Sequence, residues 1–207
     1  GERRMKCGVR RILVRDGRAA GLILDSGEEI TATHVISSIG APETQVLWSD
    51  SKETKVDAPS EALAKVGSLS FVETITILDR QPAELGWGDD TIVFFNDSER
   101  FDYARPEAQV DPRSGVICIP NNFDYGPDQQ LPEGIFRCTC LANYDRWASL
   151  PEVTYQADKK RWYDEIQRSV RRFLPPLPGP DAFAAATLAT DMFTPRTITK
   201  YTGLFGG

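Results

Sequence analysis

Two tight-turn signals near the start of the sequence constrain the fold more than any other feature. Residues 9–15 form a β-branched run that ends at Asp16-Gly17, a dipeptide typical of two-residue hairpin turns. A second apolar run, residues 20–24, ends at Asp25-Ser26-Gly27, and a third strand is expected over residues 30–39. Because two successive tight turns reverse the chain twice, the sequence predicts an antiparallel three-stranded meander.

After the meander the pattern changes to a mixture of short helices and strands. A helix is expected over residues 42–48, a polar lobe boundary over 49–57, and a second short helix over 59–66. Residues 69–79 alternate apolar and polar side chains, as a half-buried strand does. Further strands are expected over residues 91–95, 115–120, 134–142 and 183–192.

One long amphipathic helix is expected in the last third of the chain. Its apolar side chains recur at helical spacing and two prolines then end it: Tyr155, Trp162, Ile166, Val170 and Phe173, followed by Pro175 and Pro176. Strands and helices in this order predict the α+β class. The expected architecture is an antiparallel three-stranded β meander plus a mixed-sheet lobe with helices.

Composition argues against several kinds of partner and location. A formal net charge of -6 over 207 residues disfavours a nucleic-acid backbone as partner. No apolar run approaches the roughly 20 residues needed to cross a bilayer, and the first residues form no apolar signal region, so a cytoplasmic location is expected. Cys138 and Cys140 are expected to be buried, reduced thiols on one face of a strand, because their spacing fits no zinc site.

The sequence also lacks the short motifs of several enzyme classes. It contains no G-x-G-x-x-G turn, no Walker loop, no G-x-S-x-G and no H-E-x-x-H. Its one histidine, His34, falls inside an expected strand, so a Ser-His-Asp or Cys-His catalytic unit has little support. Hydrolase and metalloenzyme functions are therefore disfavoured, no metal site is predicted and no catalytic residue is assigned.

The turns and strand ends nevertheless follow a known pattern. The matching segments are Val9-Arg10-Arg11-Ile12, Asp16-Gly17, Gly21-Leu22-Ile23-Leu24, Ser26-Gly27-Glu28, Val35-Ile36-Ser37-Ser38 and Pro42-Glu43-Thr44, then Asp191-Met192-Phe193-Thr194-Pro195, Tyr201-Thr202-Gly203 and Gly206-Gly207. With these segments in this order, the chain resembles FAD-dependent oxidoreductases of the phytoene desaturase and amine oxidase superfamily.

The resemblance implies a set of cofactor contacts. In such flavoproteins the first strand passes beside the adenine of FAD, and the backbone at the position of Val9 commonly hydrogen-bonds it. Ser37, Ser38, Gly40 and Pro42 match the strand end and helix entry that approach the dinucleotide, where a glycine permits close approach of the backbone. From the residues alone, the alternative is that Val9 belongs to the core and that Gly40 and Pro42 form a helix-entry turn.

The resemblance also implies a domain organisation. Residues 1–50 would belong to an FAD-binding domain, residues 51–192 to a substrate-binding lobe, and residues 193–207 would return toward the FAD-binding domain. Because the phosphate-binding glycine turn is absent, we expect an interior fragment of a larger oxidoreductase that binds FAD only weakly by itself. Peripheral membrane association of the full-length protein and the oligomeric state are left open.

The implied reaction is hydride transfer between flavin and an apolar, polyene- or carotenoid-like substrate. Aromatic residues of the middle region are candidates for the lining of a substrate pocket, and the alternative is that they belong to the hydrophobic core. These residues are Phe94, Phe95, Phe101, Tyr103, Phe123, Tyr125 and Trp147. Two other functions stay open. One is a fragment of an amine oxidase- or protoporphyrinogen oxidase-like flavin enzyme, and the other is a non-enzymatic ligand-binding or interaction module.

Overall fold

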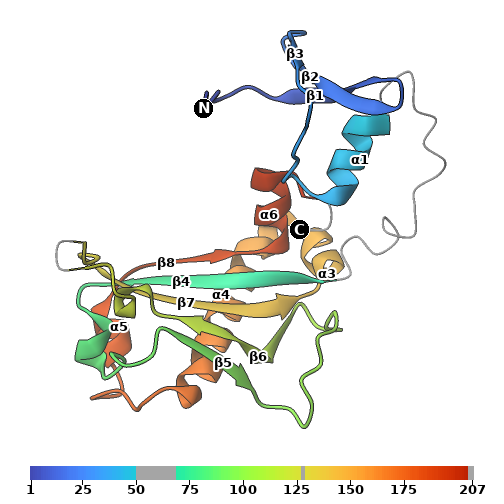
Figure 1. Ribbon diagram of the computed structural model, residues 1–207. Helices are drawn as coiled ribbons and strands as arrows, with labels where there is room; N and C mark the ends of the chain where they lie inside the picture. The colour runs from blue at the N-terminus through green and yellow to red at the C-terminus, as the bar shows by residue number, and fades with distance from the viewer. Residues whose placement is uncertain (50–68, 127–128, 205–207) are drawn as a thin grey trace. The chain divides into compact units, whose positions relative to one another are not determined.

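The computed structural model describes residues 1–49, 69–126 and 129–204. Contacts divide the chain into two compact units (Figure 1). Among the described residues, the first unit comprises 1–49 and 202–204, and the second comprises 69–126 and 129–201. Two predicted segments lie outside the described residues. They are the helix expected over residues 59–66 and all but the first residue of the lobe boundary expected over 49–57.

The first unit is built on the antiparallel meander that the turn signals predict. Strands β1 (Val9–Arg15), β2 (Arg18–Leu24) and β3 (Glu29–Thr31) pair in that order. Asp16 and Gly17 join β1 to β2 with φ angles of 51° and 71°, the pair of positive values that a type I′ turn requires. The predicted meander is therefore confirmed.

The third strand is shorter than predicted. A strand was expected over residues 30–39, but β3 ends at Thr31, and the chain then runs on to α1 (Ala41–Ser49). The turn at Gly17 rules out a strand as long as predicted, because β2 starts at Arg18 and Gly21 pairs with Thr31, so β2 offers no partner beyond residue 34. The predicted helix over residues 42–48 is confirmed as α1.

The second unit is a five-stranded sheet with helices packed against it (Figure 1). The strands follow the spatial order β5-β6-β7-β4-β8, with bounds β4 (Ser70–Leu78), β5 (Ile92–Asn96), β6 (Val110–Cys118), β7 (Gly134–Ala142) and β8 (Thr187–Phe193). Every pairing among these described strands is antiparallel. The α+β class is thus confirmed, while the sheet of this lobe is antiparallel rather than mixed.

Two strands begin elsewhere than predicted. β6 starts at Val110 instead of residue 115, because a bulge between Asp111 and Gly115 interrupts the alternation that would have marked its first half. In the stretch predicted as a strand over residues 183–192, the alanine-rich segment Ala182–Ala186 forms helix α5, and β8 follows it. The strands predicted over residues 69–79, 91–95 and 134–142 are confirmed as β4, β5 and β7.

The remaining helices connect or cover these strands. They are α3 (Tyr144–Ala148), α4 (Glu152–Val170) and α6 (Pro195–Thr202), with short 3₁₀ turns at Pro82–Leu85, Pro120–Asn122 and Arg171–Phe173. The long helix predicted from the apolar periodicity is α4 with the 3₁₀ turn that follows it. No helix in the described part of the chain has the length and apolar character to span a membrane.

Helix α4 packs on one face of the sheet and forms the core with it. Ile166 of α4 and Val72 and Phe136 of the sheet are fully buried. Inward-facing Thr74 is also buried, and its hydroxyl accepts a hydrogen bond of 3.0 Å from Nε2 of Gln167. Along β4 and β7 every second residue is buried and those between are less so, which leaves the opposite face of the sheet uncovered by α4.

The four cysteines differ in exposure. All four are free thiols; Cys7 is exposed, Cys118 is half-buried, and Cys138 and Cys140 are buried on the α4 side of β7 with their sulfurs 4.0 Å apart. The prediction that Cys138 and Cys140 are buried on one face of a strand is confirmed. The hydrogen bond with Cys140 together with burial raises the pKa of Cys138 well above its ordinary value, and burial raises the pKa of Cys118.

Truncation of Ile166 is expected to destabilise the second unit strongly. Ile166→Ala leaves a cavity under the sheet and should lower the free energy of unfolding by about 2–5 kcal/mol. Val153 lies on the same helix but is 88% exposed, so Val153→Ala should change it by no more than about 0.5 kcal/mol. Urea denaturation measures both values, and similar losses for the two variants would contradict the burial of Ile166 beneath the sheet.

Alkylation should distinguish the cysteines by exposure and pKa. Because the thiolate is the reactive form, Cys7 should react with iodoacetamide first at neutral pH. Cys118 should react more slowly and gain speed as the pH rises toward its elevated pKa, while Cys138 and Cys140 should react only after unfolding. Peptide mapping by mass spectrometry reads each rate, and labelling of Cys138 in the folded protein as fast as Cys7 would refute this order.

Candidate functional site

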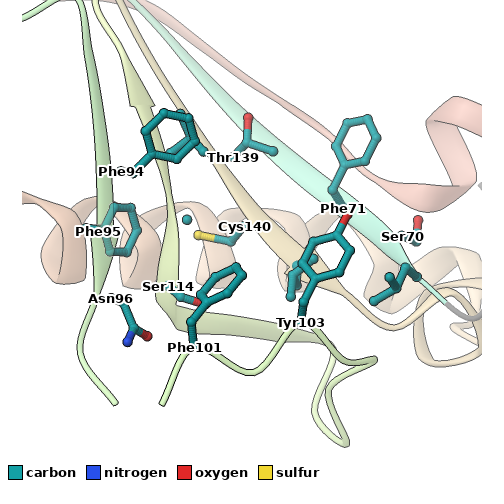
Figure 2. A pocket seen from close by; sticks show the side chains of 14 residues that line it. Ser70, Phe71, Phe94, Phe95, Asn96, Phe101, Tyr103, Ser114, Thr139 and Cys140 are labelled. Atoms are coloured by element: carbon teal, nitrogen blue, oxygen red, sulfur yellow. The ribbon is translucent and has the colours of Figure 1, made fainter. Parts of the chain in front are cut away.

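An apolar groove opens on the second unit, and we call it the aromatic groove. It has a volume of about 550 Å³, within the range of roughly 300–1,000 Å³ typical of small-molecule sites. Its walls come from β4, β5, β6 and β7 and from the connection between β5 and β6 (Figure 2). The lining residues are Leu69, Ser70, Phe71, Phe94, Phe95, Asn96, Phe101, Tyr103, Ser114, Gly115, Val116, Thr139, Cys140 and Leu141.

Four aromatic rings form the rim of the aromatic groove. Phe71 and Phe94 project from strands and are 44% and 79% exposed. Phe101 and Tyr103 come from the β5–β6 connection, and their rings stack with centroids 6.0 Å apart (Figure 2). Because large apolar side chains gathered at one exposed place usually mark a binding surface, this cluster is the main evidence for a ligand site on the lobe.

The bulge in β6 shapes the floor of the aromatic groove. Asp111 accepts hydrogen bonds from the Arg113 backbone N–H at 3.0 Å and from Arg113 Nη2 at 2.7 Å, and these bonds lower the pKa of Asp111. After the bulge, a Cβ on Gly115 would lie 2.3 Å from the carbonyl oxygen of Thr139 and 2.9 Å from the ring of Phe95. Only glycine therefore allows β6 to approach β7 this closely.

The structure separates the aromatic residues that the sequence grouped together. Phe94, Phe95, Phe101 and Tyr103 do line the aromatic groove. Phe123 and Tyr125 instead pair with each other at 6.3 Å outside it. Trp147 is fully buried in the core, where its indole N–H donates to the Gln109 carbonyl oxygen at 3.0 Å, so the alternative of plain core holds for this residue.

Sequence reasoning missed a polar pair beside the groove. Nη2 of Arg137 donates to Oε1 of Glu73 at 2.6 Å, and the same oxygen accepts from the Thr139 hydroxyl at 3.4 Å. This pair could have been predicted from the alternation of side chains between the two faces of β4 and β7. That alternation places Glu73 on the same face as Phe71, and Arg137 on the same face as Thr139.

The first unit holds the residues that the resemblance assigns to the cofactor. Val9, Ser37 and Ser38 come together around a cavity of about 580 Å³, together with apolar residues of β1, β2 and α1. Ser37 and Ser38 also line a neighbouring hollow, and Gly40 belongs to that one. Pro42 is the second residue of α1 and lies in the lining of neither.

The backbone N–H of Val9 points away from β2. β1 is an edge strand, and the N–H of Asp25 donates to the carbonyl oxygen of Gly8 at 3.0 Å, on one side of the Val9–Leu24 pair. In an antiparallel ladder the backbone groups of successive residues alternate in direction. The N–H of Val9 belongs to the same peptide group as the carbonyl of Gly8 and is therefore directed away from β2, where an acceptor on a purine edge could meet it.

Gly40 has a structural role at the start of α1. Its φ of +112° lies in the region that favours glycine, and a Cβ there would lie 2.1 Å from Oε2 of Glu43. Its carbonyl oxygen accepts from the backbone N–H of Thr44 at 3.0 Å and from the Thr44 hydroxyl at 2.6 Å. The positive φ and the close approach of Glu43 explain the glycine, and the two bonds show that it starts the helix, whether or not a ligand lies nearby.

Metal-binding groups do not gather among the described residues. Within residues 1–49, 69–126 and 129–204, no three His, Cys, Asp or Glu side chains lie close enough together to hold a metal ion. His34 is exposed, and its Nδ1 lies 3.1 Å from the hydroxyl of Thr33.

The chain has similarities to known proteins in both sequence and structure. The chain is 30% identical over 145 residues to the hydroxyneurosporene desaturase of Rubrivivax gelatinosus; the match covers 68% of this chain and 26% of that protein. An oxidoreductase from Methanosarcina mazei superposes with a TM-score of 0.49 at 14% identity, over 90% of this chain and 36% of that one. No family model matches the chain. The chain is thus similar to a desaturase and spans about a quarter of its length.

Proposed function

We propose that this chain is part of an FAD-dependent oxidoreductase that acts on an apolar, polyene-like substrate. The observation that carries the proposal is the aromatic groove, which is apolar and of ligand size, and which lies on a sheet face that α4 leaves uncovered. The similarity to a desaturase supports the redox chemistry. That relative is named for hydroxyneurosporene, which is consistent with a long apolar ligand.

The residues of the first unit fit a flavin dinucleotide in one respect. The outward N–H of Val9 offers a hydrogen-bond donor to the edge of an adenine ring, whose nitrogens accept such bonds. Ser37 and Ser38 add hydroxyl groups at the same cavity. When bound, the flavin supplies the hydride acceptor or donor. The chain contributes the wall for adenine, while its sequence contains no glycine-rich turn for the pyrophosphate.

The groove residues would hold and orient the substrate. Phe71 and Phe94 offer flat apolar surfaces to a conjugated chain, and Phe101 and Tyr103 close the other side. Covering these rings would remove water from both protein and ligand, which favours binding in proportion to the apolar area buried. A ligand-binding module without redox activity would share this groove, and FAD binding separates the two functions.

Loss of Phe94 should weaken binding of a polyene. Titration of the chain with the fluorescent polyene diphenylhexatriene measures affinity, and Phe94→Ser should lower it by roughly fivefold to tenfold because apolar contact area is lost. Phe123 is the matched control, since it is 39% exposed and lies outside the groove, so Phe123→Ser should leave the affinity unchanged. Equal effects of the two substitutions would remove the groove from the proposal.

A proline at position 9 should weaken FAD binding by the full-length protein. Val9→Pro removes an N–H that does not pair with β2, so the meander should persist, while the loss of one hydrogen bond to adenine should lower FAD affinity by roughly threefold to tenfold. Val9→Ala keeps the backbone and is the control. Flavin absorbance after gel filtration reads occupancy, and a full-length protein that binds no FAD, or a proline variant with normal affinity, would contradict the proposed contact.

A further inference from the structure

The Glu73–Arg137 pair lies on the groove side of the sheet, next to the aromatic groove. Phe71 pairs with Leu141 and both line the groove, and Glu73 pairs with Thr139 one step further along the same face. Two residues along a strand span about 7 Å. A ligand that fills the groove and extends along the strands would therefore reach Glu73 and Arg137 next.

The neighbours of Arg137 across the sheet are apolar. Arg137 is flanked by Ile75 on β4 and by Cys118 on β6, its partners across the two ladders. The side chain of Glu73 is 17% exposed and that of Arg137 is 41% exposed. An ion pair at such a half-exposed position contributes little stability, generally no more than about 1 kcal/mol. Stability is thus a weak reason for placing two charges on this face.

Arg137 also keeps unused hydrogen-bond donors. Its Nε–H is buried yet has no hydrogen-bond partner among the described residues, and only its Nη2 donates to Glu73. Buried donors are nearly always paired, so an unpaired one calls for an explanation. Glu73 holds the guanidinium in place and neutralises its charge, which leaves a fixed set of donors without a net positive charge.

We propose that Arg137 binds a neutral oxygen, a hydroxyl or a carbonyl, on a ligand whose apolar chain lies in the aromatic groove, and that Glu73 positions Arg137 for this contact. The inference rests on the proposed function only in requiring that the groove binds an apolar ligand. A neutral oxygen fits because the pair carries no net charge, whereas a carboxylate would be repelled by Glu73. The Thr139 hydroxyl, which lines the groove and donates to Glu73, links the two parts of the site.

The test compares two polyenes, one of which carries a hydroxyl group that the other lacks. All-trans-retinol and the hydrocarbon of the same skeleton without the hydroxyl are titrated against the chain by fluorescence. The wild-type protein should prefer retinol. Arg137→Met should weaken retinol binding by about tenfold, the effect of losing a hydrogen bond to a charged donor, and should change hydrocarbon binding less than about twofold.

Control variants separate the inference from the proposed function. Arg80→Gln removes another arginine paired with an aspartate, Asp79, beyond the end of β4, and should alter neither affinity. If Arg137→Met does not fold, Arg137→Lys replaces it, because one ammonium lacks the planar fork and should still reduce the retinol preference. An unchanged preference in the arginine variants, or equal losses for both ligands, overturns the role of Arg137 while the groove stands. Failure of both ligands to bind wild-type protein overturns the groove as well.

Discussion

The packing of α4 against a single face of the five-stranded sheet is the constraint on which the second unit depends. Ile166 fills the core beneath Val72 and Phe136, and Gln167 donates to the inward-facing hydroxyl of Thr74. A buried hydroxyl without a partner would cost free energy. This bond therefore favours one position of α4 along the strands, in addition to the apolar packing that holds the helix on the sheet. The opposite face is then determined, because successive side chains of a strand point to opposite sides.

That opposite face carries the candidate site. Residues between the buried positions of β4 and β7 supply Phe71, Glu73, Arg137 and Thr139, a mixture of apolar and paired polar groups that a purely solvent-facing strand does not need. The bulge before Gly115 adds depth, since it brings the ring of Phe95 and the thiol of Cys140 to the groove from the core side. The helix that stabilises the sheet and the groove that could bind a ligand are thus two consequences of one alternating pattern.

The sequence predicted those parts of the fold whose signals are local. The Asp16-Gly17 turn set the pairing of β1 and β2, and the uninterrupted alternation over residues 69–79 and 134–142 placed β4 and β7. Prediction failed for strand boundaries that depend on residues distant in the sequence. β3 cannot extend to residue 39 because β2 begins at Arg18. The start of β6 is hidden by a bulge whose Asp111–Arg113 hydrogen bonds cannot be read from composition. Neither limit is visible in a window of neighbouring residues.

The two candidate sites differ in how much of them a sequence can reveal. The groove is made of side chains, yet aromatic residues alone did not separate Phe94 in the groove from Trp147 in the core, because that distinction depends on which face each occupies. The contact assigned to Val9 would use backbone atoms, and their direction follows from the ladder register, not from the identity of residue 9. A backbone site tolerates changes of side chain but not a shift of register. Its sequence signal therefore lies less in the valine itself than in what sets the register, namely the Asp16-Gly17 turn and the two irregularities of the ladder, at Leu13–Val14 and Val9–Arg11, that follow it.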